Sequence, residues 1–179
     1  MAARHRHHLP RRKYHWPDIQ LNIWLIVVLA GSGACLGMYA WLMTVQTQLD
    51  LGTPWLFPFM VATSSLGVAF VVIILILAAR HLLLPGIIML GSFILFVLWL
   101  TGLVESALQM FGGKADVNAD CQNFITNMPY RGNTVEALAW LTQYNICNCW
   151  KATFAFEVVN TAFYLWMMVM SWQVHRDAL

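Results

Sequence analysis

Two acidic residues lie inside long hydrophobic stretches of this sequence. Glu157 falls within Cys147–Val174, which is long enough to cross a bilayer, and Glu105 falls within an earlier stretch. Because a carboxylate is costly in hydrocarbon, each side chain should face other helices, where polar groups or a proton can satisfy it. Asn160 and Thr161 share a helical stripe with Glu157. The spacing predicts an intramembrane polar cluster made of these four residues.

This predicted cluster has three interpretations. It can be a structural knot that fixes helix register through hydrogen bonds, a proton or cation site, or a contact with a partner membrane protein. We favour the structural knot, because no chain of acids or histidines leads from the cluster to the opposite side of the membrane. In the predicted topology both Glu105 and Glu157 fall in the outer half of the membrane, where they could face each other or share Lys151.

The cysteines are the second set of residues able to do chemistry. Cys121, Cys147 and Cys149 lie towards the two ends of a polar segment, whereas Cys35 lies deep in the first hydrophobic run and is predicted to be a packing residue. On an oxidising side of the membrane Cys121 could bridge to either of the other two. A four-span thiol oxidase would carry two loop cysteine pairs, one of them C-x-x-C, and this sequence has a single C-x-C. Redox catalysis is therefore a minor alternative.

Other catalytic signatures are also missing from the sequence. It contains no Walker loop, no H-E-x-x-H, no G-x-S-x-G and no pair of histidines at metal spacing. We therefore predict a protein that is not an enzyme, with no catalytic residue, cofactor or metal site.

Composition and hydropathy predict the elements that position these residues. The chain has 179 residues, of which 60% are apolar and 10% charged, with a mean hydropathy of +0.63. A soluble domain would carry about 25% charged residues, so lipid is the expected solvent. We predict an all-α integral membrane protein, a four-helix transmembrane bundle with spans at about 19–45, 54–79, 83–110 and 149–174. An outer loop at 112–148 would contain at most a short amphipathic helix, at Val135–Tyr144.

The first predicted span carries a pair of glycines at a spacing typical of helix contacts. Gly33 and Gly37 form a small-xxx-small motif, which lets two helix backbones approach closely in a membrane. We predict that this motif packs against another helix of the same chain. Homodimerisation is the alternative.

The charged residues predict the orientation. Residues 1–18 hold half of all Lys and Arg, and a basic tail beside a hydrophobic span attracts anionic lipid headgroups and stays on the cytosolic side. Both termini, including residues 175–179, are therefore expected in the cytosol, with the 112–148 loop outside the cell or in a secretory lumen. A nucleic-acid partner is not expected, and the tail histidines His5, His7, His8 and His15 are interpreted as solvated. The predicted headgroup contacts are Arg4, Arg6, Arg11, Arg12 and Lys13.

The whole arrangement resembles the MARVEL-domain family, particularly its small fungal members. The resemblance rests on four spans, cytosolic termini, a short first outer loop, a larger second outer loop with cysteines, and a fourth span reading CNCWKATFAFEVVNTAFYLWMMVMSWQV. It implies a membrane-organising role in the plasma membrane or secretory pathway, through lateral contacts with lipids, with a membrane-protein partner or with further copies of the chain. The alternatives are an accessory subunit of a larger membrane complex and, less favoured, a thiol-redox enzyme or a small transporter.

Overall fold

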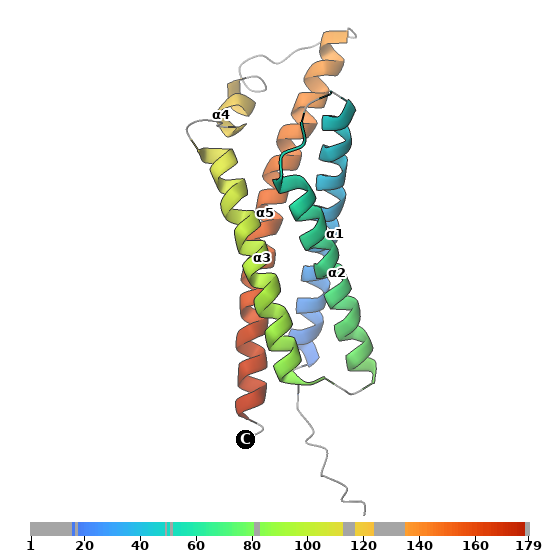
Figure 1. The fold of residues 1–179 in the computed structure, drawn as a ribbon, viewed down its shortest axis with the longest axis vertical. Coiled ribbons are helices and arrows are strands. Elements are labelled where there is room, and N and C mark those ends of the chain that lie inside the picture. The colour runs from blue at the N-terminus through green and yellow to red at the C-terminus, as the bar shows by residue number, and fades with distance from the viewer. Residues whose placement is uncertain are drawn as a thin grey trace, which may run out of the picture.

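Four long helices make up most of the part of the chain that the structure describes (Figure 1). The computed structural model describes residues 16, 18–48, 50, 52–80, 83–112, 117–123 and 135–177. Within them the helices are α1 (Asp18–Gln48), α2 (Leu56–Ala79), α3 (Pro85–Phe111), the short α4 (Val117–Cys121) and α5 (Val135–Arg176). The four long ones are each long and apolar enough to cross a membrane. The predicted all-α, four-helix transmembrane bundle is confirmed.

Local sequence explains where these helices begin and end. Pro85 is at the start of α3, where its missing N–H costs no helical hydrogen bond. At the other end of α3, the backbone N–H of Gly112 donates to the carbonyl of Leu108 at 2.8 Å. After α1 the chain turns through Asp50, whose φ of 52° is left-handed. Aspartate is one of the few residues other than glycine that adopt this conformation readily.

The helices are arranged as a four-membered ring. α1 packs against α2 and α5, and α3 packs against α2 and α5, so that α1 lies diagonally opposite α3. Figure 1 shows that the last turn of α1, the first turn of α2 and the last turn of α3 lie at the end near α4, which we call the disulfide end. The start of α1, the last turn of α2, the first turn of α3 and the last turn of α5 lie at the opposite, terminal end.

The fourth long helix extends further than the sequence predicts. α5 has 42 residues, a length of about 63 Å, roughly twice the hydrocarbon thickness of a bilayer. It begins at Val135, so residues 135–148 of the predicted outer loop are helical. The short helix expected at Val135–Tyr144 is the first part of α5 instead of a separate element. No proline or glycine interrupts the sequence between Val135 and Arg176, which explains the continuity.

Aromatic rings fill the centre of the bundle. Trp24 of α1 meets the ring of Tyr164 of α5 edge to face at 5.7 Å, and Trp99 of α3 stacks on the same tyrosine at 6.5 Å. All three side chains are fully buried. α2 packs against α3 at Gly102, where an added Cβ would overlap the Met60 sulfur of α2. This glycine lets α2 and α3 lie close together.

Candidate functional site: the buried polar core around Glu157

Glu157 lies at the centre of the bundle and is 0% exposed. Its Oε1 accepts a hydrogen bond from the hydroxyl of Tyr39. The same hydroxyl lies 3.3 Å from the Oγ of Ser106. The three residues come from α5, α1 and α3, so in this polar node the Tyr39 hydroxyl of α1 contacts both α5 and the diagonally opposite α3. The other carboxyl oxygen, Oε2, has no hydrogen-bond partner among the described residues.

The threonines near Glu157 donate to their own helix. The hydroxyl of Thr161 donates to the carbonyl of Glu157 at 2.7 Å, and that of Thr153 donates to the carbonyl of Trp150 at 2.9 Å. Such bonds satisfy a buried hydroxyl without a second helix. Cys35 of α1 is fully buried beside the carbonyl of Thr153, at 4.0 Å, where it acts as the predicted packing residue.

A second group of buried polar side chains packs on two glycines. At Gly31 of α1 an added Cβ would lie 2.6 Å from the Oδ1 of Asn160. At Gly67 of α2 it would lie 2.8 Å from the Oγ of Ser32 and 3.0 Å from the hydroxyl of Tyr164. Neither amide atom of Asn160 finds a hydrogen-bond partner within the described residues. Gly31 therefore lets α1 approach α5, and Gly67 leaves room on α2 for Ser32 of α1 and the Tyr164 hydroxyl of α5.

The two predicted intramembrane acids have different surroundings. Glu105 is half-buried on α3, and its Oε1 accepts a hydrogen bond from Gln109 at 3.2 Å. Its neighbour Ser106 is the residue that points into the core, because successive residues of a helix point about 100° apart. Lys151 is exposed. Of the hydrogen bonds seen in the described residues, none joins Glu105 to Glu157. The partner of Glu157 is Tyr39 instead, which the sequence did not identify.

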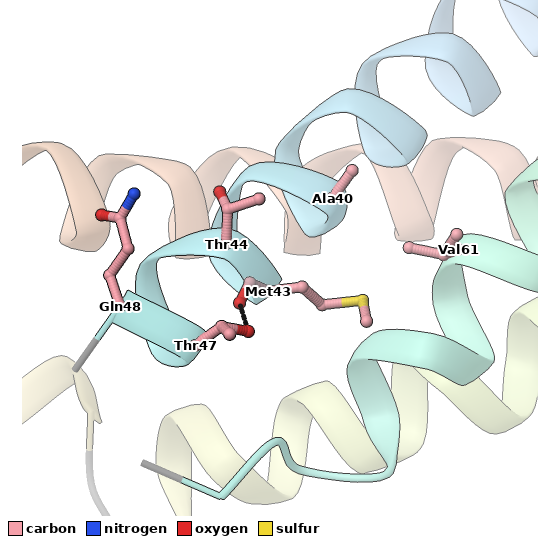
Figure 2. Close-up of a pocket in the computed structure, with 6 residues that line it drawn as sticks. All are labelled: Ala40, Met43, Thr44, Thr47, Gln48 and Val61. Atoms are coloured by element: carbon pink, nitrogen blue, oxygen red, sulfur yellow. Dashed lines mark hydrogen bonds between the residues drawn. The ribbon is translucent and has the colours of Figure 1, made fainter. Parts of the chain in front are cut away.

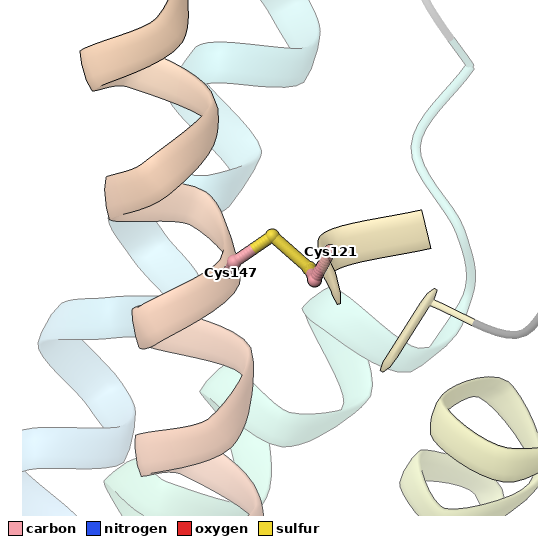
Figure 3. The surroundings of a disulfide bond; sticks show 2 residues. All are labelled: Cys121 and Cys147. Atoms are coloured by element: carbon pink, nitrogen blue, oxygen red, sulfur yellow. A yellow bond between two sulfur atoms is a disulfide. The ribbon is translucent and has the colours of Figure 1, made fainter. Parts of the chain in front are cut away.

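One of the two possible cysteine pairs is formed. Cys121 and Cys147 make a disulfide with a Cα–Cα distance of 5.9 Å (Figure 3). Cys149 is a half-buried free thiol. Because it is two residues further along α5, it points about 200° away from Cys147 around the helix. The disulfide ties α4 to α5 at the level where α3 ends.

The glycine pair of α1 does not make the predicted contact within the protein. Gly33 and Gly37 are both exposed, and an added Cβ would meet nothing within 4 Å at either. The buried stripe of α1 runs instead through Ser32, Cys35 and Tyr39. Gly31 makes the close approach to α5 in their place. The small-xxx-small pattern therefore did not identify the side of α1 that packs against the other helices.

The outward faces of the helices differ in character. On α2 and α3 large aliphatic side chains such as Ile73, Leu90 and Ile94 are about half exposed, as expected for helices facing lipid. From Ala30 onwards, α1 instead exposes mainly small or polar residues, with Trp41 as the exception. We call this set the small-residue face: Ala30, Gly33, Gly37, Ala40, Thr44, Thr47 and Gln48.

Two shallow grooves lie along α1, and the first is lined in part by residues of this face. One, of about 480 Å³, lies between α1 and α2 near the disulfide end (Figure 2). The other, of about 490 Å³, lies between α1 and α5 and includes Trp41, Asn148 and Cys149. Within the described part of the chain no three His, Cys, Asp or Glu residues lie close enough to hold a metal ion. The predicted headgroup contacts Arg4, Arg6, Arg11, Arg12 and Lys13, and the tail histidines, lie outside the described residues.

The arrangement around Glu157 is suited to fixing helix positions. A shift of α1 along α5 would separate Tyr39 from the carboxyl group, and a shift of α3 would separate Ser106 from the Tyr39 hydroxyl. Each shift would leave buried polar atoms without partners, at a cost of about 1–3 kcal/mol each. No protein-family model, curated protein or solved structure matches the chain, so the resemblance to MARVEL-domain proteins stays a prediction from the sequence.

Proposed function

We propose that this protein is a non-enzymatic organiser of membrane domains that works through lateral contacts of its helices with lipids and with other copies of itself. The small-residue face of α1 is the observation that carries the proposal. Lipid tails are as apolar as leucine, so large aliphatic side chains gain little from leaving lipid for another helix. Small residues instead allow backbones to approach, and hydroxyl or amide groups can bond across the contact.

The sealed interior supports the same function. Glu157, its hydroxyl partner Tyr39 and the amide of Asn160 are each 0% exposed, and their geometry is that of a helix-locking node. Because these polar groups are inaccessible from the outside, the outward faces of the helices make the contacts with lipids and with other proteins. The resemblance to MARVEL-domain proteins implies the same role.

The proposed orientation puts the disulfide end outside the cell or in the lumen of the secretory pathway. Disulfides persist in oxidising compartments, and Cys121–Cys147 lies at that end. The excess of basic residues near the two termini favours the cytosol for the terminal end by the positive-inside tendency. The plasma membrane is the proposed location.

Self-association in vesicles tests this function. The full chain, labelled with donor and acceptor dyes in separate batches, is reconstituted at falling protein-to-lipid ratios, and energy transfer is measured. We expect transfer to persist on dilution, and the double variant Gly33→Leu with Gly37→Leu to weaken association about tenfold, or ~1.4 kcal/mol. The new side chains would hold partner backbones apart.

The matched control is Gly86→Leu, because Gly86 is also exposed and an added Cβ would meet nothing within 4 Å. It should associate like the unmodified chain. Transfer that falls to the level of random collisions for the unmodified chain would contradict self-association. Dependence on a larger protein present in fixed ratio would favour the accessory-subunit alternative.

A further inference from the structure

Glu157 has no basic partner among the described helices. α1 and α3 each contain one charged residue, the acids Asp18 and Glu105, and α2 contains none. On α5, Lys151 is the base that precedes Glu157, but it is exposed and lies about 120° away around the helix. The other bases of α5 are in its last turn, at the terminal end. These helices therefore place no cation beside Glu157 to compensate a negative charge.

The hydrogen bonds of Glu157 come from neutral groups alone. Oε1 accepts from the Tyr39 hydroxyl, whereas Oε2 is buried and has no partner among the described residues. The amide of Asn160, one turn further along α5, can bond to either form of the carboxyl group and compensates no charge. A carboxylate accepts through both oxygens, but a carboxylic acid needs only one oxygen that accepts and one that carries a proton. The surroundings of the two oxygens therefore fit the neutral acid.

Aromatic rings lie on both sides of Glu157 along the bundle. Towards the disulfide end, the ring of Tyr39 packs on Phe57 at 5.7 Å, and Phe57 packs on Trp150 at 5.7 Å. All three side chains are buried. Towards the terminal end lie the aromatic rings that fill the centre of the bundle. Neither groove along α1 is lined by Glu157, so these rings keep water, which would solvate a carboxylate, away from it.

We propose that Glu157 is a proton-binding site. At neutral pH it is a neutral carboxylic acid, with Oε1 as the carbonyl oxygen that accepts from Tyr39 and Oε2 as the protonated oxygen, and Phe57 and Trp150 shield it from the disulfide end. The contact between α1, α3 and α5 then depends on one bound proton. This site lies in the interior and goes beyond the proposed function, which uses the outward faces of the helices.

The groups that face the site from each helix favour the neutral form. α1 brings the hydroxyl of Tyr39 and the buried thiol of Cys35, α3 brings the hydroxyl of Ser106, and α2 brings no ionisable group. The one charged residue of α3, Glu105, is also an acid. A second negative charge nearby disfavours ionisation. The bound proton thus removes a charge that no neighbour would stabilise.

Infrared spectroscopy of the full chain tests the protonation state. The chain is reconstituted in vesicles of ether-linked lipids, which have no ester carbonyl. A protonated carboxyl group has a carbonyl stretching band that carboxylates lack, and exposed acids are ionised at neutral pH. We expect this band in the unmodified chain at neutral pH, its loss in Glu157→Gln and its retention in Glu105→Gln, the matched control.

Tyr39→Phe gives a second readout in a chain that keeps Glu157. The hydrogen bond from Tyr39 weakens the carbonyl bond at Oε1, so its removal should move the band to higher wavenumber. Tyr144→Phe, at a residue 40% exposed, should leave the band in place. The absence of the band from the unmodified chain at neutral pH would overturn the proposal. So would a band that survives Glu157→Gln and disappears in Glu105→Gln, or one that does not move in Tyr39→Phe.

Hydrogen–deuterium exchange of the same band tests the shielding by the aromatic rings. In D₂O the band moves to lower wavenumber when the carboxyl proton is replaced, so the rate of this shift reports the access of water to Glu157. We expect several-fold faster exchange in Phe57→Ser, because a small polar side chain in place of the buried ring admits water. Phe59→Ser makes the same change at a half-buried ring that packs on Trp55 and should exchange like the unmodified chain. Equal rates in the two variants would overturn the shielding by Phe57.

Discussion

Replacing Tyr39 by Phe removes the hydroxyl that joins α1 to α5 and α3 while keeping the ring. The ring packs on Phe57 at 5.7 Å, and this contact survives the change. What is lost is the hydrogen bond to Glu157 and the contact with Ser106 at 3.3 Å. A hydrogen bond contributes about 0.5–1.5 kcal/mol net, and more when a buried partner is left without one. Interhelical hydrogen bonds in membranes have averaged about 0.6 and reached about 1.7 kcal/mol.

We therefore expect Tyr39→Phe to lower the free energy of unfolding by about 1–2 kcal/mol. The measurement is equilibrium unfolding of the full chain by steric trapping in bicelles, which avoids a strong denaturant. Tyr144→Phe is the control, because Tyr144 is 40% exposed and stacks on Trp140. Its effect should stay within about 0.5 kcal/mol.

A double-mutant cycle separates the hydrogen bond from other effects of the change. Glu157→Leu leaves the Tyr39 hydroxyl without its acceptor, whereas the pair of changes removes both polar groups together. We expect the double variant to be more stable than the sum of the two single effects by about 1 kcal/mol. Additive effects, or a Tyr39→Phe effect equal to that of Tyr144→Phe, would show that the hydrogen bond between Tyr39 and Glu157 does not stabilise the bundle.

Three further predictions follow from the packing, the disulfide and the second acid. Gly67→Ala should lower the free energy of unfolding by about 1–3 kcal/mol, because its Cβ would meet Ser32 and Tyr164, while Gly33→Ala should change little; steric trapping of both variants checks this. Cys121→Ser should remove the difference in gel mobility between reduced and unreduced chain and lower stability by about 3 kcal/mol, given a separation of 26 residues. Cys149→Ser should leave both unchanged, and a lost mobility difference in it would contradict the pairing. Glu105→Gln should change the free energy of unfolding by less than about 0.5 kcal/mol, since that half-buried site keeps an accepting oxygen.

The sequence predicted the fold because the hydrophobic runs are long and separated by clear breaks. Asp50 and Pro54 mark the break between the first two spans, and Arg80 and Pro85 mark the break between the second and the third. Helix lengths follow from bilayer thickness. The start of α5 was missed because residues 135–148 are more polar than a membrane span. Hydropathy reports where a helix enters lipid and does not report where the helix itself begins.

The candidate site could be predicted only in part. The burial of Glu157 followed from the cost of a carboxyl group in hydrocarbon, but its partner Tyr39 is 118 residues away and no local pattern indicates it. Whether Gly33 faces the other helices or the outside of the bundle was also not predictable. Lipid-facing and core-facing residues are both apolar in a membrane, so the periodicity that distinguishes them in water is weak. The choice of Cys147 over Cys149 needed the position of α4.

Extraction of the protein from its native membrane into polymer nanodiscs, at native expression level, tests the organising function most directly. Mass photometry would give the size of the particles, and mass spectrometry would identify every protein and lipid in them. We expect assemblies of this chain alone, with a lipid composition that differs from the bulk membrane. A larger membrane protein recovered in fixed ratio, or single copies in lipid of bulk composition, would contradict it.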